Sequence, residues 1–229
     1  MNLVEFIKEY QSLVGSFLAV ISSLFIVFIN FYINRRKEIR GSKKEIEEIF
    51  LMAARESEDI VKDLEYFLFE ARKKLQKREA GMLVFVPPKF NRIYLNEERL
   101  FGLKKNLGFI LSQQVDIATS SGKKLNGYLN HFENGPGLIF DKAIKVLEVE
   151  LMTKDKAIGV YIKDLENYLN GIEKILSGEI GIAQKHLLRP VVAQKHGECE
   201  LDKMPLEILD KILDKETEIV LLDLKQKLS

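Results

Sequence analysis

The chain has 229 residues, a formal net charge of +1, 46% apolar and 30% charged residues, and a single cysteine. The near-neutral charge argues against a protein that binds polyanions over its whole surface, and the apolar share is too high for a disordered chain. The lone cysteine excludes an intramolecular disulfide framework. The composition therefore predicts a folded protein without disulfide cross-links.

An uncharged run near the amino terminus is the first element along the chain. Residues 10–34 contain no Asp, Glu, Lys, Arg, His or Pro. As a helix, the apolar centre over 13–33 would measure about 30 Å at about 1.5 Å per residue, which matches the hydrocarbon thickness of a bilayer. We predict a short tail over 1–11 and a transmembrane helix over 12–34.

Two other interpretations of this run are weaker. A cleaved signal peptide has a basic start, an apolar region of about 7 to 15 residues and a small-residue cleavage site. Here Glu5 and Glu9 lie near the start, the apolar run is longer, and Arg35 and Arg36 follow it. A buried core helix would need more surrounding protein than the rest of the chain offers.

Basic residues gather directly after the run, whereas only Lys8 precedes it. They are Arg35, Arg36, Lys37, Arg40, Lys43 and Lys44. Basic residues beside a span are retained in the cytoplasm, so we predict a single-pass protein of the cell membrane with its amino terminus outside and its carboxyl-terminal domain cytoplasmic. Each basic residue near anionic headgroups is worth about 1 kcal/mol, so this set should hold the chain against membrane lipid.

Small residues recur every four positions within the run, at Gly15, Ala19 and Ser23, and Asn30 lies near the same stripe. This spacing lets two helices approach closely in lipid, and a buried amide can form a hydrogen bond across the contact. The stripe predicts a homo-oligomer that packs through the anchor. The alternative is an ordinary spanning helix in which Asn30 reaches the headgroup layer.

Residues 35–229 are predicted to form one cytoplasmic helical domain. The first amphipathic stretch has apolar residues at helical spacing, at Ile39, Ile46, Phe50, Ala53, Ile60, Leu64, Phe67, Ala71 and Leu75, and should end near Gly81. A weak loop over 81–95 contains Pro87 and Pro88, which interrupt helices. Its apolar residues over 82–94 should cover the end of the core; contact with the membrane surface or a partner is the alternative.

Asn96 is a favourable amino-terminal cap, and the apolar pattern after it predicts a second helix that runs to about Phe132. Asn134-Gly135-Pro136-Gly137 predicts a strong turn. A third helical region over 138–176 should follow, as one helix or as two, because Thr153 and Gly159 lie within it.

The stretch 178–204 has the weakest periodicity and is predicted as a loop, and Pro205 should open the last helix. The sequence therefore predicts an all-α fold in which one transmembrane helix precedes a bundle of long, amphipathic, coiled-coil-like helices.

Few residues form a pattern typical of catalysis, metal binding or phosphate binding. Ser120-Ser121-Gly122-Lys123-Lys124 lacks the upstream glycine and the following hydroxyl of a phosphate-binding loop. His186, His196 and Cys199 are the only cluster of soft ligands; they could hold zinc if their loop folded back, but we expect ordinary loop residues. We predict no catalytic residue, metal, cofactor or small-molecule substrate.

Short basic clusters occur at Arg72-Lys73-Lys74, Lys104-Lys105 and Lys123-Lys124. Acidic residues are interspersed among them, so we expect solvated helix faces and no specific nucleic-acid binding.

The leading hypothesis is a membrane-anchored helical protein that acts by protein contact, as a scaffold, adaptor or signal-transmitting module, and not as an enzyme. The alternative is an oligomerising effector that perturbs the bilayer through its transmembrane helix. An enzyme whose site is assembled from scattered residues is a third, weaker hypothesis.

Overall fold

The computed structural model describes residues 3–77, 89–149, 154–196, 198–201 and 203–228, and all regular structure within them is helical. The predicted all-α fold is confirmed. In chain order the elements are α1 (Leu3–Lys77), α2 (Glu97–Lys104), α3 (Phe109–Val149), α4 (Lys154–Ile175), the π-helical turn η1 (Leu176–Ile180), α5 (Gly181–Lys195), α6 (Glu198–Leu201) and α7 (Leu206–Leu228).

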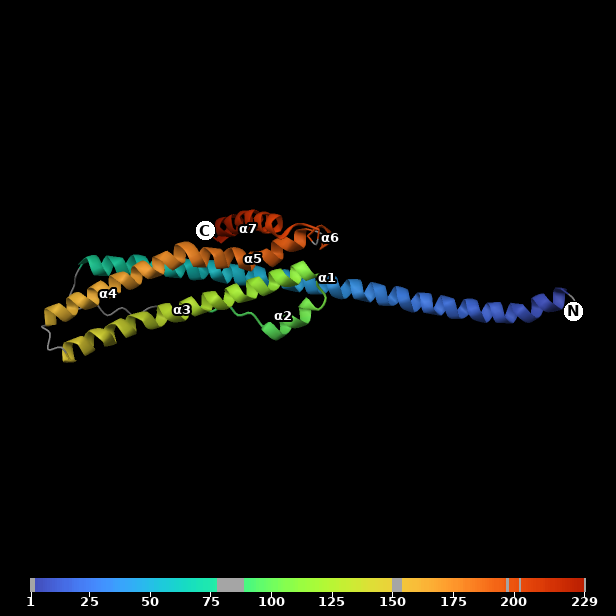
Figure 1. Ribbon diagram of the computed structural model, residues 1–229, viewed down its shortest axis with the longest axis horizontal. Coiled ribbons are helices and arrows are strands. Elements are labelled where there is room, and N and C mark those ends of the chain that lie inside the picture. The colour runs from blue at the N-terminus through green and yellow to red at the C-terminus, as the bar shows by residue number, and fades with distance from the viewer. Residues whose placement is uncertain (1–2, 78–88, 150–153, 197, 202, 229) are drawn as a thin grey trace.

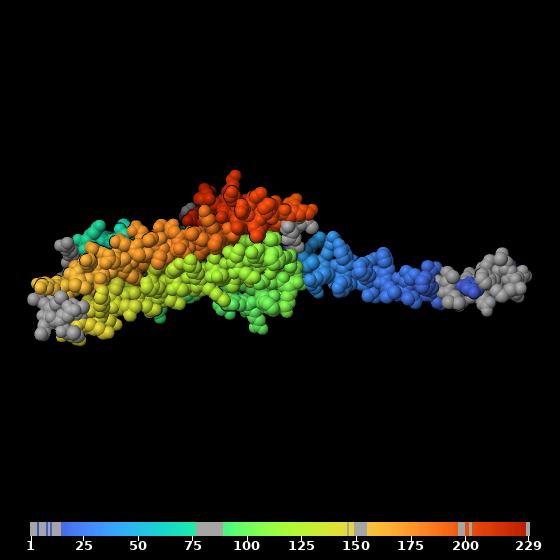
Figure 2. All heavy atoms as spheres, viewed as in Figure 1, coloured from blue at the N-terminus to red at the C-terminus, as the bar shows by residue number. Residues whose placement is uncertain are grey.

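Three long rods form the bundle (Figure 1). They are the carboxyl-terminal half of α1, the helix α3, and the rod made by α4, η1 and α5 in succession. The helix α7 packs on α5, and α2 lies beside α1 and α3. At one end of the bundle α1 continues alone, so that the space-filling view shows a broad body with a single projecting helix (Figure 2).

Helix α1 passes from the apolar run into the bundle core without interruption. The expected boundary between residues 34 and 35 lies inside this helix. Ser42, Ile46 and Phe50 are the first buried residues that it contributes. The amphipathic stripe predicted from the sequence then enters the core: Ile46, Phe50, Ala53, Ile60, Leu64, Phe67 and Ala71 are all buried.

The segment 89–96 is an extended strap along α3. Phe90 and Ile93 are buried, and the Ile93 N–H donates to Asn126 Oδ1 at 3.0 Å while the Asn126 amide donates back to the Ile93 carbonyl at 2.8 Å. The Phe90 N–H donates to Glu133 Oε1 at 2.8 Å. For Phe90 and Ile93, the expectation that these residues cover the core is therefore confirmed. Met82, Pro87 and the rest of 78–88 lie outside the described residues.

The helix predicted over 96–132 is in fact two helices. Asn96 caps α2 as predicted, because its side-chain oxygen accepts the Arg99 N–H at 3.0 Å, but α2 ends at Lys104 and α3 begins at Phe109. The intervening turn reverses the chain, so that Lys123 of α3 pairs with Glu97 at the start of α2 at 2.8 Å. Both segments carry helical periodicity, and periodicity alone does not reveal a reversal between them.

The predicted turn at Asn134-Gly135-Pro136-Gly137 is wrong, because α3 continues through it to Val149. A proline inside a helix leaves the carbonyl four residues earlier without its usual N–H donor. Here that carbonyl belongs to Phe132, and the Tyr168 hydroxyl of α4 donates to it. Gly135 has no side chain to obstruct the Tyr168 ring, which packs against its backbone. A tertiary contact therefore keeps this segment helical.

The predicted loop over 178–204 is also wrong, because most of its described residues lie in η1, α5 and α6. The reason is burial: α5 packs against α1, α3 and α7, and a helix that is covered on most sides loses the alternation of apolar and polar faces. Its buried residues are Ala183, Gln184, Leu187, Leu188, Arg189, Pro190, Val191, Val192 and Ala193.

Candidate functional site

The amino-terminal half of α1 carries a continuous apolar surface with no other part of the described chain packed on it. Phe17, Phe25 and Phe28 are each about two-thirds exposed, and their aliphatic neighbours are exposed as well. Among the described residues, α1 is the one helix long and apolar enough to cross a membrane. Soluble proteins usually expose apolar residues singly or in small patches, and this continuous apolar surface is larger.

The small-residue stripe lies on this exposed helix. Gly15 has no neighbouring atom within 4 Å of the place where a side chain would begin, and Ala19 and Asn30 are exposed. The Ser23 hydroxyl donates to the Ala19 carbonyl at 2.8 Å, a bond within the same helix. Packing of two anchors through this stripe stays a prediction.

The basic residues after the run divide into two groups. Arg35 ties the helix to the bundle: its guanidinium donates to Asn106 Oδ1 at 2.5 Å and to the Lys105 carbonyl at 3.4 Å. Arg36 stacks over the Tyr32 ring at 4.8 Å from its centroid. The others, Lys37, Arg40, Lys43 and Lys44, follow on α1; Lys44 pairs with Glu48 at 3.7 Å, and Lys43 is half-buried.

Asn106 completes this junction, although its role was not predicted from the sequence. Besides accepting from Arg35, its amide donates to the buried Ser42 hydroxyl at 2.9 Å. It could not be found from the sequence because residue 106 falls where a continuous helix was predicted. We define the junction as Arg35, Ser42, Lys105 and Asn106.

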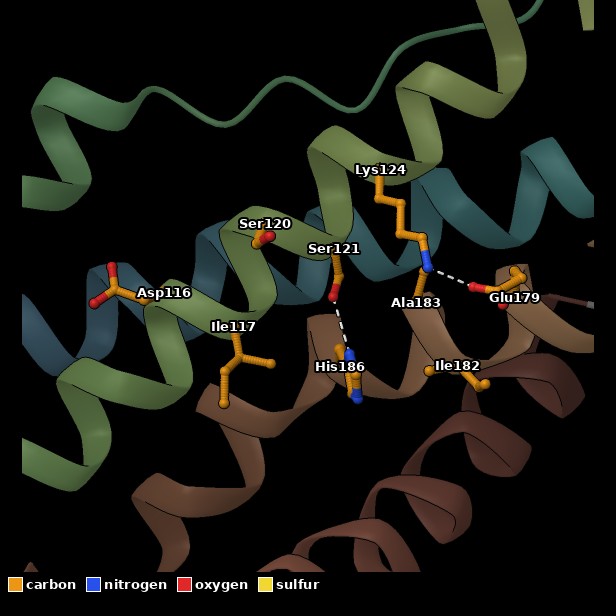
Figure 3. A pocket seen from close by; sticks show the side chains of 9 residues that line it. All are labelled: Asp116, Ile117, Ser120, Ser121, Lys124, Glu179, Ile182, Ala183 and His186. Carbon is orange, nitrogen blue, oxygen red and sulfur yellow. Dashed lines mark hydrogen bonds and ion pairs between the residues drawn. The ribbon is translucent and has the colours of Figure 1, made fainter. Parts of the chain in front are cut away.

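A groove of about 460 Å³ lies between α3 and α5, and a few polar side chains face into it from an otherwise apolar lining (Figure 3). Ser121 Oγ and His186 Nδ1 lie 2.9 Å apart across it, and Lys124 Nζ pairs with Glu179 at 2.5 Å. Partial burial, with a smaller effect of the Arg189 charge, lowers the pKa of His186, which favours the neutral form of its ring beside the Ser121 hydroxyl. The Lys124 ammonium lowers the pKa of Glu179 by hydrogen bonding to it.

The Ser121 and His186 pair resembles part of a nucleophile and base arrangement, but its setting does not favour that chemistry. Ser121 lies inside α3, where the backbone N–H groups form the helix's own hydrogen bonds and cannot serve as oxyanion donors. The pair therefore acts as a hydrogen bond between two helices.

The soft ligands noted in the sequence have separate partners. His186 contacts Ser121, whereas His196 Nε2 lies 3.0 Å from Glu216 Oε2 of α7. The side chain of Cys199 is outside the described residues. Within the described part of the chain, no group of three His, Cys, Asp or Glu residues is placed to hold a metal ion.

The basic clusters on the bundle are matched by acidic residues. Arg72 pairs with Glu173, and Lys104 pairs with Asp116. Lys123 and Lys124 likewise pair with Glu97 and Glu179. These pairs interrupt the positive surface on which nucleic-acid binding would depend.

Comparison of the chain with known protein families, curated proteins and solved structures finds no match. The candidate functional site is therefore defined by the chain's own geometry. It consists of the exposed apolar half of α1 and the junction that ties this half to the bundle.

Proposed function

We propose that the protein is anchored in a membrane by residues 12–34 and acts on the cytoplasmic side through protein contacts of its helical bundle. The observation that carries the proposal is the course of α1, which is apolar and uncovered over its first half and part of the core over its second. Exposure of these apolar side chains to water is unfavourable. A bilayer can accommodate the segment, because a helix forms its backbone hydrogen bonds within itself.

The unbroken helix supports a signal-transmitting role within this proposal. Ile46, Phe50 and Leu64 of α1 are fully buried in the hydrophobic core, where α1 packs mainly against α5 and also against α4. A tilt or rotation of the anchor would therefore move core side chains directly, because no loop intervenes. Tyr66 and Phe69, one turn apart on α1 and both about two-thirds exposed, are candidate positions for partner contact.

The topology has a direct test. Protease added outside intact cells should leave the bundle intact, and protease added to permeabilised cells should digest it. Digestion of the carboxyl-terminal portion in intact cells would contradict the cytoplasmic placement.

The protein-contact role is tested by crosslinking in membranes, followed by detergent extraction and identification of the captured proteins. Tyr66→Ser and Phe69→Ser should reduce capture of a genuine partner, whereas Tyr94→Ser, at an even more exposed aromatic residue on the strap, should not. A wild-type protein that is monomeric and captures nothing would contradict this role.

The membrane-active effector remains a second candidate, because the open space beside Gly15 leaves room for a second helix. Replacement of Gly15 and Ala19 by leucine should then abolish oligomers and any loss of membrane potential on overproduction. Unchanged assembly in this variant would exclude packing through the stripe.

A further inference from the structure

We infer that the corner between α2 and α3, residues 101–109, is a second membrane contact that binds the surface of an anionic bilayer. This inference rests on the proposed anchoring of α1 and adds a site in a different part of the chain. It concerns how the bundle sits on the membrane.

The junction sets the corner's height relative to the bilayer. Arg35 follows the last apolar residue of the anchor, Ile33, by two positions, and its guanidinium holds both Asn106 and the Lys105 carbonyl. Asn106 also donates a hydrogen bond to Ser42, which lies about two helical turns after Arg35 on α1. The corner is thus fixed where the apolar run ends, at the end of the bundle from which α1 emerges (Figure 1).

The exposed side chains of the corner suit an interfacial layer. Phe101 is 63% exposed and Phe109 is 76% exposed. The next two residues, Ile110 and Leu111, are buried, so Phe109 is the apolar residue at the start of α3 that faces outward. Exposed aromatic residues beside basic residues are typical of segments that lie in the headgroup region.

Charge at the corner favours anionic lipid. The Lys105 ammonium lies 5.0 Å from the centroid of the Phe101 ring, so the apolar and the basic groups are side by side. Arg36 and Lys37 on α1 extend the positive surface around the anchor. Among the acidic residues around the corner, Glu38 pairs with Arg35, Asp116 with Lys104 and Glu97 with Lys123, while Glu98 also lies beside Phe101. Basic residues in such positions are attracted to phosphate-rich surfaces over a Debye length.

The chain contains no tryptophan, so a single introduced tryptophan reports on one position. The full chain would be reconstituted into vesicles of phosphatidylcholine and phosphatidylglycerol, without brominated lipid, with lipid brominated near the headgroup to report on position 109, or with lipid brominated near the end of the acyl chain to report on position 25. Phe109→Trp is the test position, and Phe25→Trp within the apolar run reports on the anchor. Phe69→Trp is the matched control, since Phe69 is similarly exposed but lies on the bundle surface, far along α1 from the apolar run.

If the corner contacts the membrane, brominated lipid quenches Phe109→Trp and Phe25→Trp but not Phe69→Trp. Quenching of Phe25→Trp alone would overturn the inference and leave the anchor in place. No quenching at position 25 would overturn the proposed anchoring itself, and this inference with it.

Two additional variants separate docking from simple proximity. Asn106→Ala in the Phe109→Trp background removes the two side-chain hydrogen bonds of Asn106, to Arg35 and to Ser42, and leaves the weaker contact of Arg35 with the Lys105 carbonyl. It should reduce quenching at position 109 at least twofold, with no change in a Phe25→Trp background. Lys105→Glu should do the same in anionic vesicles and have a smaller effect in phosphatidylcholine alone. Equal quenching in all of these samples would show that the corner is merely near the bilayer and does not bind it.

Discussion

The Tyr168 hydroxyl donates a hydrogen bond to the Phe132 backbone carbonyl, the carbonyl that Pro136 leaves without a helical donor. Phe132 is fully buried, so this carbonyl would otherwise lose its water without gaining a partner. Burial also raises the pKa of Tyr168, which keeps its proton in place over the physiological range.

Tyr168→Phe should lower the free energy of unfolding by about 1–3 kcal/mol, the usual cost of an unsatisfied buried polar group. Chemical denaturation of the full chain in detergent measures it. Tyr94→Phe removes the hydroxyl of an exposed tyrosine and should change little. In a Pro136→Ala background the helix regains its own donor, so the cost of Tyr168→Phe should fall; an undiminished cost would show that the two residues are not coupled.

Gly135→Ala should destabilise the protein by about 1–3 kcal/mol, because the added methyl group would overlap the Tyr168 ring and force it away from Phe132. Gly127→Ala is the matched control on the same helix, where nothing lies within 4 Å. There the substitution should stabilise α3 by about 0.5–1 kcal/mol, since alanine is the better helix former. Thermal unfolding of both variants checks the opposite signs.

Arg189 holds α7 on the bundle. Its side chain is buried and donates to Asp210 at 2.9 Å and to Asp214 at 2.6 Å, which lie one turn apart on α7. Replacing both aspartates by asparagine should cost about 2–3 kcal/mol, because a buried charge loses its counter-ions. Arg189→Met, which removes the charge itself, should cost less. Hydrogen exchange should locate the loss in α7; equal stability of all three proteins would contradict this role.

The free energy of unfolding should depend on pH through His186. Its folded pKa is lower than its ordinary value, so the unfolded chain binds the proton more readily. The contribution is complete above the ordinary histidine pKa and is lost as pH falls from there toward the folded pKa. His186→Gln should flatten this dependence between pH 8 and 5.5, while the exposed His131→Gln should retain it. A dependence that His186→Gln leaves unchanged would assign the effect to other groups.

The all-α class and the α1 stripe could be predicted because both follow from local periodicity. Ile46, Phe50 and Leu64 recur at helical spacing on a helix that keeps one solvent face, and Asn96 caps α2 through its own side chain. These signals lie within a few residues of one another in the chain.

The predicted turn at 134–137 and the predicted loop over 178–204 are wrong because distant residues decide the local structure there. Gly135 and Pro136 specify a turn in isolation, and only Tyr168, far along the chain, makes a helix the better solution. Helix α5 has little solvent-exposed face to impose a period, since α1, α3 and α7 cover most of it. The junction at Asn106 depends on Arg35, about seventy residues earlier, so no local pattern could reveal it.

Alkaline carbonate extraction of cell membranes tests anchoring by α1 most directly. The wild-type protein should stay in the membrane pellet. Phe25→Arg with Phe28→Arg should release it, because each charge at the centre of a span costs about 2.5–3.5 kcal/mol. Tyr66→Arg with Phe69→Arg, at equally exposed positions of the bundle, should not release it. A wild-type chain found in the soluble fraction would contradict the account.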